Sequence, residues 1–368
     1  MDRPQEYEVD TPPDTGPDAV PAVWVVSGYR AGERTQILAL AEALGWPYVV
    51  KDLRLRPWDF VPGLLRRSSL AGIDRRRSSP LEPPWPDLVI SAGMRNEPVA
   101  KWIRDQARGR CRLVHVGRPW TACEEFDLVI TTPQYRLPDR ANILQNTGTM
   151  HGVNAPALAA EAARWLPEFA HLKRPFTGLL VGGNSGPYTL GPKTAQRLGR
   201  EASAMVRRAG GSLLVTTSAR TSRTAAEALA AAIDCPNFFY RWTADAAANP
   251  YLGILATADA LIVTNDSVSM LSEAVATGKP LHMFDLGPTD ESDFRVGAVI
   301  YRWLMGHAHP RLTRDLDLFH RRLVDNGQAA WLGKAGPERS QPPLEDLARA
   351  VIRVRQLLGM RGDDGPGT

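Results

Sequence analysis

Short apolar runs alternate with amphipathic stretches along the first 150 residues of the chain. The runs that predict buried strands are 22–27, 48–53, 86–91, 112–116 and 126–131. Helical patterns fill 35–44, which ends before Gly45, and the stretch that closes at Arg108. Because strands that alternate with helices pair in parallel, we expect residues 22–150 to form a parallel sheet with helices on both faces.

The same alternation begins again near residue 175. Strands are predicted at 176–181, 212–217, 237–241, 260–264 and 280–284, and helices at 191–208, 224–233, 251–258 and 269–276. At about 100–200 residues per domain, a chain of 368 residues is long enough for two domains. The pattern therefore predicts an α/β protein with two Rossmann-like domains.

The remaining segments complete the predicted domain organisation. It comprises a disordered leader (1–21), an N-terminal domain (22–150), a hinge (151–174), a C-terminal domain (175–300), a helical extension (301–358) and a disordered tail (359–368). The leader is acidic and proline-rich and lacks the apolar centre of a signal peptide. The amphipathic helix 344–358 is expected to pack back on the first domain.

Composition and charge argue against several classes of protein. The three cysteines form no CxxC pair and no histidine stands at metal-ligand spacing from them, so neither a disulfide framework nor a metal site is expected. No run of 18 apolar residues predicts a membrane-spanning helix. A net charge of +4 is too small for a nucleic-acid-binding surface. We expect a cytoplasmic protein.

Polar loops follow four strands of the second domain. They are Gly182–Gly186, Thr216–Thr221, Trp242–Pro250 and Thr264–Met270. Ligands of open α/β sheets bind at such strand ends, and helix N-termini favour anions there. Neither glycine loop matches the dinucleotide or P-loop pattern, which weakens both interpretations. A plain turn at the glycines, with Ser267 or Ser269 as a helix cap, stays open as the alternative.

At these loops the sequence resembles a known family. The segments that carry the resemblance are QILALAEALG (36–45), LLVGGNSGPY (179–188), LLVTTSART (213–221) and the stretch 249–280, which contains DSVSM. They are similar to the mitochondrial-fission "elongated mitochondria" family and its bacterial homologues. That family is in turn similar to the GT-B glycosyltransferases, including the lipid-linked transferase of peptidoglycan synthesis. The resemblance covers about residues 22–300.

The resemblance implies a GT-B-like fold, in which an acceptor domain and a nucleotide-sugar domain face a cleft. Glu273 would bind ribose, and Arg220 would neutralise phosphates. The other implied nucleotide-sugar-binding residues are Gly183, Asn184, Ser185, Asn265, Asp266, Ser267, Val268, Ser269 and Met270. No cofactor and no metal are implied, since the nucleotide-diphosphate sugar is a co-substrate.

The first domain departs from the family pattern. Where the family has G-H-E-N-Q, this chain has Gly32-Glu33-Arg34-Thr35-Gln36, so Glu33 replaces the histidine. Because GT-B transferases commonly take their base from this loop, Glu33 is the candidate general base. The alternative is a glutamate favoured by the helix dipole. His115 is expected to be a buried core histidine, and His151 is expected to pack in the hinge.

Residues 51–77 carry eight basic and three acidic residues, interleaved with leucine and aromatic side chains. Such a stretch can lie on an anionic membrane, which would place the protein on the inner face of the membrane. A solvated basic loop is the alternative.

The leading functional hypothesis is transfer of a sugar from a nucleotide-diphosphate donor to an envelope lipid or saccharide. The alternatives are a non-catalytic adaptor and a nucleotide-sugar epimerase.

Overall fold

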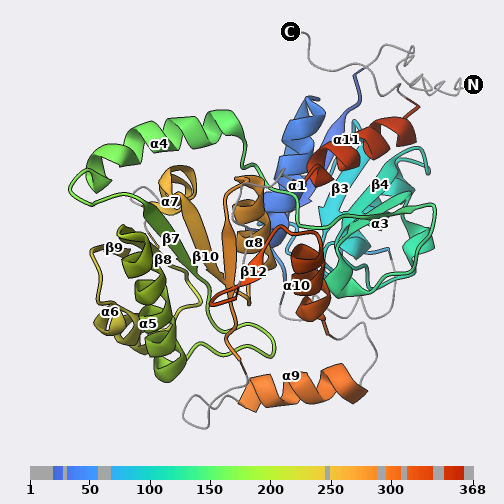
Figure 1. The fold of residues 1–368 in the computed structure, drawn as a ribbon. Coiled ribbons are helices and arrows are strands. Elements are labelled where there is room, and N and C mark those ends of the chain that lie inside the picture. The colour runs from blue at the N-terminus through green and yellow to red at the C-terminus, as the bar shows by residue number, and fades with distance from the viewer. Residues whose placement is uncertain are drawn as a thin grey trace, which may run out of the picture.

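The computed structural model describes residues 20–27, 31–56, 68–244, 249–287, 296–307, 313–334 and 344–359. Its strands form two separate six-stranded sheets (Figure 1). Neighbouring strands are parallel in every pairing, from β1 with β2 to β8 with β9. The prediction of two Rossmann-like domains is confirmed.

The first sheet has the order β2-β1-β3-β4-β5-β6. Its strands are β1 (Val23–Ser27), β2 (Tyr48–Asp52), β3 (Leu88–Ala92), β4 (Arg112–Val116), β5 (Leu128–Thr131) and β6 (Ile143–Gln145). Every residue of β1, β3 and β5 is buried, as expected for strands covered on both faces. Helices α1 (Ala31–Leu44) and α11 (Asp346–Leu357) pack on one face and α3 (Glu97–Gln106) on the other.

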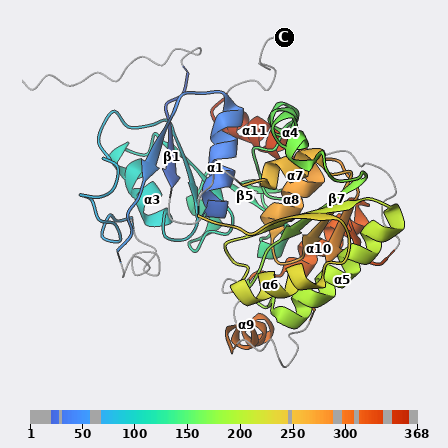
Figure 2. The same ribbon diagram turned by 90° about the vertical axis from the view of Figure 1, so that its left-hand side faces the viewer.

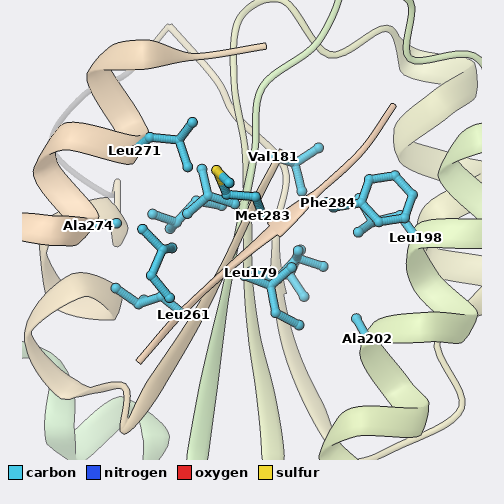
Figure 3. Close-up of a cluster of buried hydrophobic side chains, with 14 of the residues drawn as sticks. Leu179, Val181, Leu198, Ala202, Leu261, Leu271, Ala274, Met283 and Phe284 are labelled. Carbon is cyan, nitrogen blue, oxygen red and sulfur yellow. The ribbon is translucent and has the colours of Figure 1, made fainter. Parts of the chain in front are cut away.

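The second sheet has the order β12-β11-β10-β7-β8-β9. Its strands are β7 (Phe176–Val181), β8 (Ser212–Thr217), β9 (Asn237–Tyr240), β10 (Ala260–Thr264), β11 (Leu281–Phe284) and β12 (Ala330–Trp331). The helices around it are α5 (Pro192–Ala209), α6 (Arg223–Ala232), α7 (Tyr251–Thr257), α8 (Val268–Ala276) and α10 (Leu316–Asp325). In Figure 3, Leu198 and Ala202 of α5 and Leu271 and Ala274 of α8 approach the strands from opposite sides.

Most elements agree with the sequence pattern. The predicted strands 112–116, 176–181, 212–217 and 260–264 match β4, β7, β8 and β10 residue for residue. Helix α1 begins at Ala31, earlier than the predicted start at residue 35, so Glu33 lies in its first turn. Strands β6 and β12 and helix α10 were not predicted. The two strands are three and two residues long, too short to show a period of their own.

The segment predicted as a C-terminal extension contributes to both halves of the protein. Strand β12 pairs with β11 at the edge of the second sheet. Helix α11 packs on the first sheet as expected, with Ala350 and Val354 fully buried against α1. Helix α9 (Val296–His307) stands away from both sheets (Figure 2) and exposes Val296, Ile300 and Trp303.

The connection between the two halves runs through residues 146–150 and α4 (Ala155–Phe169). The Asp346 carboxylate at the start of α11 accepts hydrogen bonds from the Thr147 N–H at 2.9 Å and the Gly148 N–H at 2.6 Å. The Thr149 N–H donates to the Ser272 hydroxyl of α8 at 2.9 Å. The connection is therefore fastened to a helix from each half.

Candidate functional site

The strand order of each sheet reverses once, and open α/β sheets bind ligands at such reversal points. The reversal lies between β1 and β3 in the first sheet and between β7 and β10 in the second. The loops after β7 and β10 meet directly, because the Gly182 N–H donates to Thr264 Oγ1 at 2.8 Å. This junction holds most of the residues that the sequence analysis selected.

Asp266 organises the junction from a fully buried position. Its carboxylate accepts hydrogen bonds from the Thr264 hydroxyl at 2.7 Å and the Gly183 N–H at 3.0 Å, and it pairs with Arg220 at 2.7 Å. Burial raises the pKa of Asp266, and the Arg220 guanidinium opposes that shift. The carboxylate of Asp266 is engaged by these groups inside the protein, and contact between Asp266 and a ligand stays a prediction.

Arg220 is the exposed partner of this ion pair. Its side chain is 39% exposed, whereas that of Asp266 is 0% exposed. The buried carboxylate thus holds a guanidinium in one orientation at the carboxyl edge of the second sheet. A cation fixed in this way is suited to a phosphate, which guanidinium binds in bidentate fashion.

The glycine loop after β7 leaves no room for side chains at its first two positions. A Cβ on Gly182 would overlap the Asp266 carboxylate, and a Cβ on Gly183 would overlap the carbonyl oxygen of Arg220. Glycine is required here for close packing of the two loops on either side of Arg220.

The backbone N–H groups of the glycine loop already have acceptors within the protein. The Gly183 N–H donates to Asp266, the Asn184 N–H to the Arg220 carbonyl at 3.4 Å and the Ser185 N–H to the Tyr188 carbonyl at 3.2 Å. The loop therefore does not present a ready set of amides to a phosphate. Gly183, Asn184 and Ser185 contribute through their position beside Arg220.

The loop after β10 leads into α8 through a serine cap. The Ser267 hydroxyl accepts a hydrogen bond from the Met270 N–H at 3.4 Å, so Ser267 is the N-cap. Val268 is buried and Met270 packs against the core of the second domain. The side chains of Val268 and Met270 thus serve packing, and ligand binding by these two residues, through the backbone of Val268, stays a prediction.

Asn265 has a structural role as well. Its side-chain amide donates to Asp285 Oδ1 at 2.9 Å and accepts from the Leu286 N–H at 3.2 Å. These bonds tie the end of β10 to the loop that follows β11. Asn265 is 2% exposed, and its selection as a ligand-binding residue stays a prediction.

Glu273 lies one turn into α8 and is held by two hydroxyl groups. The Tyr251 hydroxyl donates to Oε2, and the Ser269 hydroxyl donates to Oε1 at 3.3 Å. Burial raises the pKa of Glu273. A carboxylate oxygen has two lone pairs, so each oxygen retains one acceptor position for a further hydroxyl group.

Glu33 lies at the reversal point of the first sheet. It stands in the first turn of α1, which follows β1, and its carboxylate occupies the space that a Cβ on Gly93 after β3 would fill. Gly93 has a φ of +78°. Glu33 is half-buried, so its carboxylate is not sealed from solvent in the way that Asp266 is.

A buried polar group behind the first sheet was not predicted. Glu97 accepts hydrogen bonds from the Trp120 N–H at 2.6 Å and the Thr121 N–H at 3.1 Å, and burial raises its pKa to about 7. His115 is buried as predicted, with Nδ1 3.1 Å from Ser91 Oγ, and desolvation lowers its pKa to about 3. These groups are closed to solvent and have a structural role.

Little in the sequence indicates this cluster. Glu97 is the first residue of a helix, where a glutamate complements the helix dipole and is usually exposed, so its burial was not expected. His151 follows the connection between the halves, as expected, and burial lowers its pKa. Among the described residues, no group of histidine, cysteine, aspartate and glutamate is placed to hold a metal ion. No described helix is long and apolar enough to cross a bilayer.

The family model "Mitochondrial fission ELM1" matches residues 31–358, which include every strand after β1 and every candidate residue from Glu33 to Glu273. The chain belongs to the mitochondrial fission ELM1 family. This confirms the family that the loop motifs indicated.

A curated ELM1 relative is the mitochondrial fission protein ELM1 of Arabidopsis thaliana. It is 27% identical over 299 residues, which cover 75% of this chain and 65% of the Arabidopsis protein. The chain thus spans less than two thirds of that relative's length.

Two solved structures match most of the length of this chain at low sequence identity. A UDP-GlcNAc 2-epimerase from Neisseria meningitidis, bound to UDP-GlcNAc, matches with a TM-score of 0.48 and 11% identity, covering 92% of this chain and 100% of the other. The glycosyltransferase SnogD from Streptomyces nogalater matches with a TM-score of 0.44 and 14% identity, covering 93% and 96%.

Proposed function

We propose that this ELM1-family protein binds a nucleotide-diphosphate sugar at the reversal point of the second sheet and transfers the sugar to an acceptor. The observation that carries the proposal is the Arg220 guanidinium, fixed at the carboxyl edge by the buried Asp266. Keeping a carboxylate buried costs free energy unless it is paired. A fixed, partly exposed cation is what a diphosphate requires.

The start of α8 adds to this anion site. The first N–H groups of a helix lack partners within the helix, and the helix dipole favours negative charge there. Ser267 satisfies one of these groups, leaving those of Val268 and Ser269 directed to the same edge. Glu273, one turn further on, accepts the ribose hydroxyls through the acceptor positions that Tyr251 and Ser269 leave open.

Glu33 is the proposed general base. Its carboxylate removes the proton from the acceptor hydroxyl as the bond to the sugar forms, and the leaving diphosphate stays paired with Arg220. The position of Glu33 at the reversal point of the first sheet supports this role. Its place in the first turn of α1 also suits the alternative role, a glutamate that complements the helix dipole.

The proposed acceptor is an envelope lipid or saccharide, reached from an anionic membrane surface through residues 51–77. Residues 57–67 of this segment lie outside the described part of the chain. In the described part, the exposed basic residues are Arg54, Arg56, Arg75, Arg76 and Arg77. Leu53 is buried and Leu55 packs beside it in the core of the first domain, so the expectation that these two act as membrane anchors is wrong.

Nucleotide binding distinguishes the proposed transferase from a non-catalytic adaptor. Isothermal titration calorimetry with UDP is the direct test. Glu273→Gln should weaken UDP binding by about 1.5–3 kcal/mol, the range for a charge-assisted hydrogen bond. Tyr251→Phe controls for the loss of the hydroxyl contact, and Arg223→Gln controls for a change in an exposed ion pair on α6. Equal UDP affinity in wild type and Glu273→Gln contradicts the ribose assignment.

Transfer of radiolabel from UDP-sugar to lipid or saccharide separates a transferase from an epimerase, which would yield a second free sugar nucleotide. Glu33→Gln should keep UDP affinity and lower turnover by about 10²–10⁴-fold. A variant with near-normal turnover returns Glu33 to the helix-dipole role.

The membrane part is tested by vesicle co-sedimentation, in which Arg66→Glu with Arg67→Glu should release the protein from anionic vesicles. Wild type that stays in the supernatant at low and high salt removes this part of the proposal.

A further inference from the structure

A small pocket opens at the carboxyl edge of the first sheet, apart from the residues assigned above. The space inside it that a water-sized group can occupy is about 10 Å³, enough for one such group. Its lining includes Gln36 of α1, Thr131 at the end of β5, Tyr135, Asn146 after β6, Gly148 and Met150. The space fits one hydroxyl-bearing group at a time and not an extended chain.

Two buried oxygen atoms in this lining have no hydrogen-bond partner. They are Oγ1 of Thr131, a residue 2% exposed, and Oδ1 of Asn146, a residue 1% exposed. The orientation of the Asn146 amide follows from its other end, because Nδ2 donates to the Asp346 carbonyl at 3.3 Å. A buried polar atom without a partner costs about 1–3 kcal/mol, so this pair is unfavourable unless a donor reaches it.

The chemistry of the lining defines that donor. The unpartnered atoms are an amide oxygen, which only accepts hydrogen bonds, and a hydroxyl oxygen. The lining is formed by uncharged residues, among them Gln36, Tyr135 and Met150. An anion would meet the negative end of the Asn146 amide dipole, and no residue of the lining is a cation. A neutral group with hydroxyl hydrogens satisfies both oxygens.

The pocket lies next to α8 of the second half. Its lining residue Gly148 has no space for a Cβ, which would overlap the hydroxyl of Ser272. Ser272 precedes Glu273, the residue assigned to the ribose. A group in the pocket is therefore separated from the nucleotide-sugar site by little more than the first turns of α8.

We infer that the pocket is the subsite for a sugar hydroxyl of the acceptor, with Thr131 and Asn146 as positioning residues. This inference rests on the proposed transferase function, because only a transferase has an acceptor. It adds a substrate class: the group bound beside α8 is a neutral saccharide, and a phosphate headgroup is disfavoured. The hydroxyl that enters the pocket donates to Asn146 Oδ1 and exchanges a hydrogen bond with Thr131.

The experiment uses the full chain and saturation-transfer NMR titrations with glucose, galactose and N-acetylglucosamine, and with inorganic phosphate as the anionic probe. Wild type should bind at least one of the sugars at this subsite, and phosphate should not compete with it. Thr131→Val should weaken the sugar by roughly two- to tenfold, the loss of one hydrogen bond. Thr131→Ser keeps the hydroxyl and should bind like wild type.

A stability readout identifies the unpartnered atom itself. Without sugar, Thr131→Val should raise the melting temperature by about 1–3 °C, because it removes a buried oxygen that has no partner. Thr257→Val is the matched control: its hydroxyl donates to the Gly253 carbonyl at 2.7 Å, so it should lower the melting temperature and leave sugar binding unchanged.

Two results overturn the inference: no sugar binds, or Thr131→Val binds sugar as well as wild type does. A crystal structure soaked with the sugars that holds only water against Thr131 and Asn146 overturns it too. UDP titration of the same variants keeps the two proposals apart. If Thr131→Val still binds UDP but sugar binding is absent from wild type, the subsite fails while the nucleotide site stands. If wild type binds no UDP, the proposed function fails.

Discussion

The carboxyl edges of the two sheets share one backbone arrangement but differ in how the carboxylate at each edge is paired and exposed. In each, a glycine after one strand makes room for a carboxylate from the neighbouring connection: Gly182 for Asp266 in the second sheet and Gly93 for Glu33 in the first. Asp266 is fully buried and paired with Arg220, whereas Glu33 is half-buried. The same backbone arrangement thus fixes a cation in one half and leaves a carboxylate accessible in the other.

The difference extends to the surroundings of each edge. At the second edge, the backbone N–H groups of Gly183, Asn184 and Ser185 donate hydrogen bonds within the protein. At the first edge, Thr131 and Asn146 keep buried oxygens without partners. Two buried titratable groups of the first half lie deeper, where Glu97 Oε1 is 3.9 Å from His115 Nε2. A rigid charged edge suits a diphosphate, and a neutral edge with unsatisfied acceptors suits hydroxyl groups.

The largest expected effect comes from removing the buried charge at the second edge. Asp266→Ala leaves the buried Thr264 hydroxyl and Gly183 N–H without their acceptor, which costs about 1–3 kcal/mol each in the free energy of unfolding, and leaves the partly exposed Arg220 unpaired from it. Urea denaturation measures this cost. Glu227→Gln, which alters the exposed pair with Arg223, is the control and should change stability by less than about 1 kcal/mol. A similar small loss in Asp266→Ala would contradict the role given to Asp266.

The burial of Glu97 in the first half should make the free energy of unfolding depend on pH. The pKa of Glu97 is about 7 in the folded protein, above the ordinary value of about 4.3 expected in the unfolded chain. Between these values the folded state keeps a proton that the unfolded state has released. Stability contributed by Glu97 is therefore present at low pH and is lost as pH rises through about 7, by about 3–4 kcal/mol.

The measurement compares urea denaturation of wild type and Glu97→Gln at pH 5, 6, 7 and 8. In the Glu97→Gln variant, stability should not show the fall toward pH 7 that titration of Glu97 causes in wild type. His115 acts in the opposite direction, because its lowered pKa makes stability fall as pH drops below about 6.5. The difference between wild type and variant isolates Glu97 from His115, and parallel pH profiles would show that Glu97 does not titrate in this range.

A smaller effect is expected from crowding the glycine loop of the second edge. Gly183→Ala places a Cβ against the carbonyl oxygen of Arg220 and should cost about 1–3 kcal/mol, the range for overpacking. UDP affinity should fall with it, because the shift displaces Arg220. Gly152→Ala is the matched control, since a Cβ there meets nothing within 4 Å. Equal melting temperatures for the two variants would show that the loop is less tightly packed than described.

The smallest expected effect concerns the connection between the two edges. Asp346→Asn keeps one acceptor for the Thr147 and Gly148 N–H groups but removes the charge, and should cost about 1 kcal/mol. Hydrogen exchange of these two amides should become faster. Asp325→Asn changes an exposed aspartate on α10 and should leave both amides as they are. Unchanged exchange of both amides in Asp346→Asn would show that the stability of the connection does not depend on its hydrogen bonds to the Asp346 side chain of α11.

The sequence by itself determined the two sheets, their parallel strands and the loops that carry the polar residues. Strands such as β5 and β10 are nearly continuous apolar runs, and a run of this kind is a local property that can be recognised without knowing the partner strand. The motif at 249–280 likewise indicated the family through its own residues. Short edge strands such as β12 and the full extent of α1 did not have a local pattern strong enough to be predicted.

Only the tertiary structure decided what each polar side chain does. Asp266 and Asn265 are neighbours in the loop after β10, yet the first turns to Arg220 and the second to Asp285. Neither partner is close in sequence, because parallel strands are joined by long crossover connections. The direction of a polar side chain depends on which distant loop the sheet order places beside it, and that order is set by packing of the whole domain.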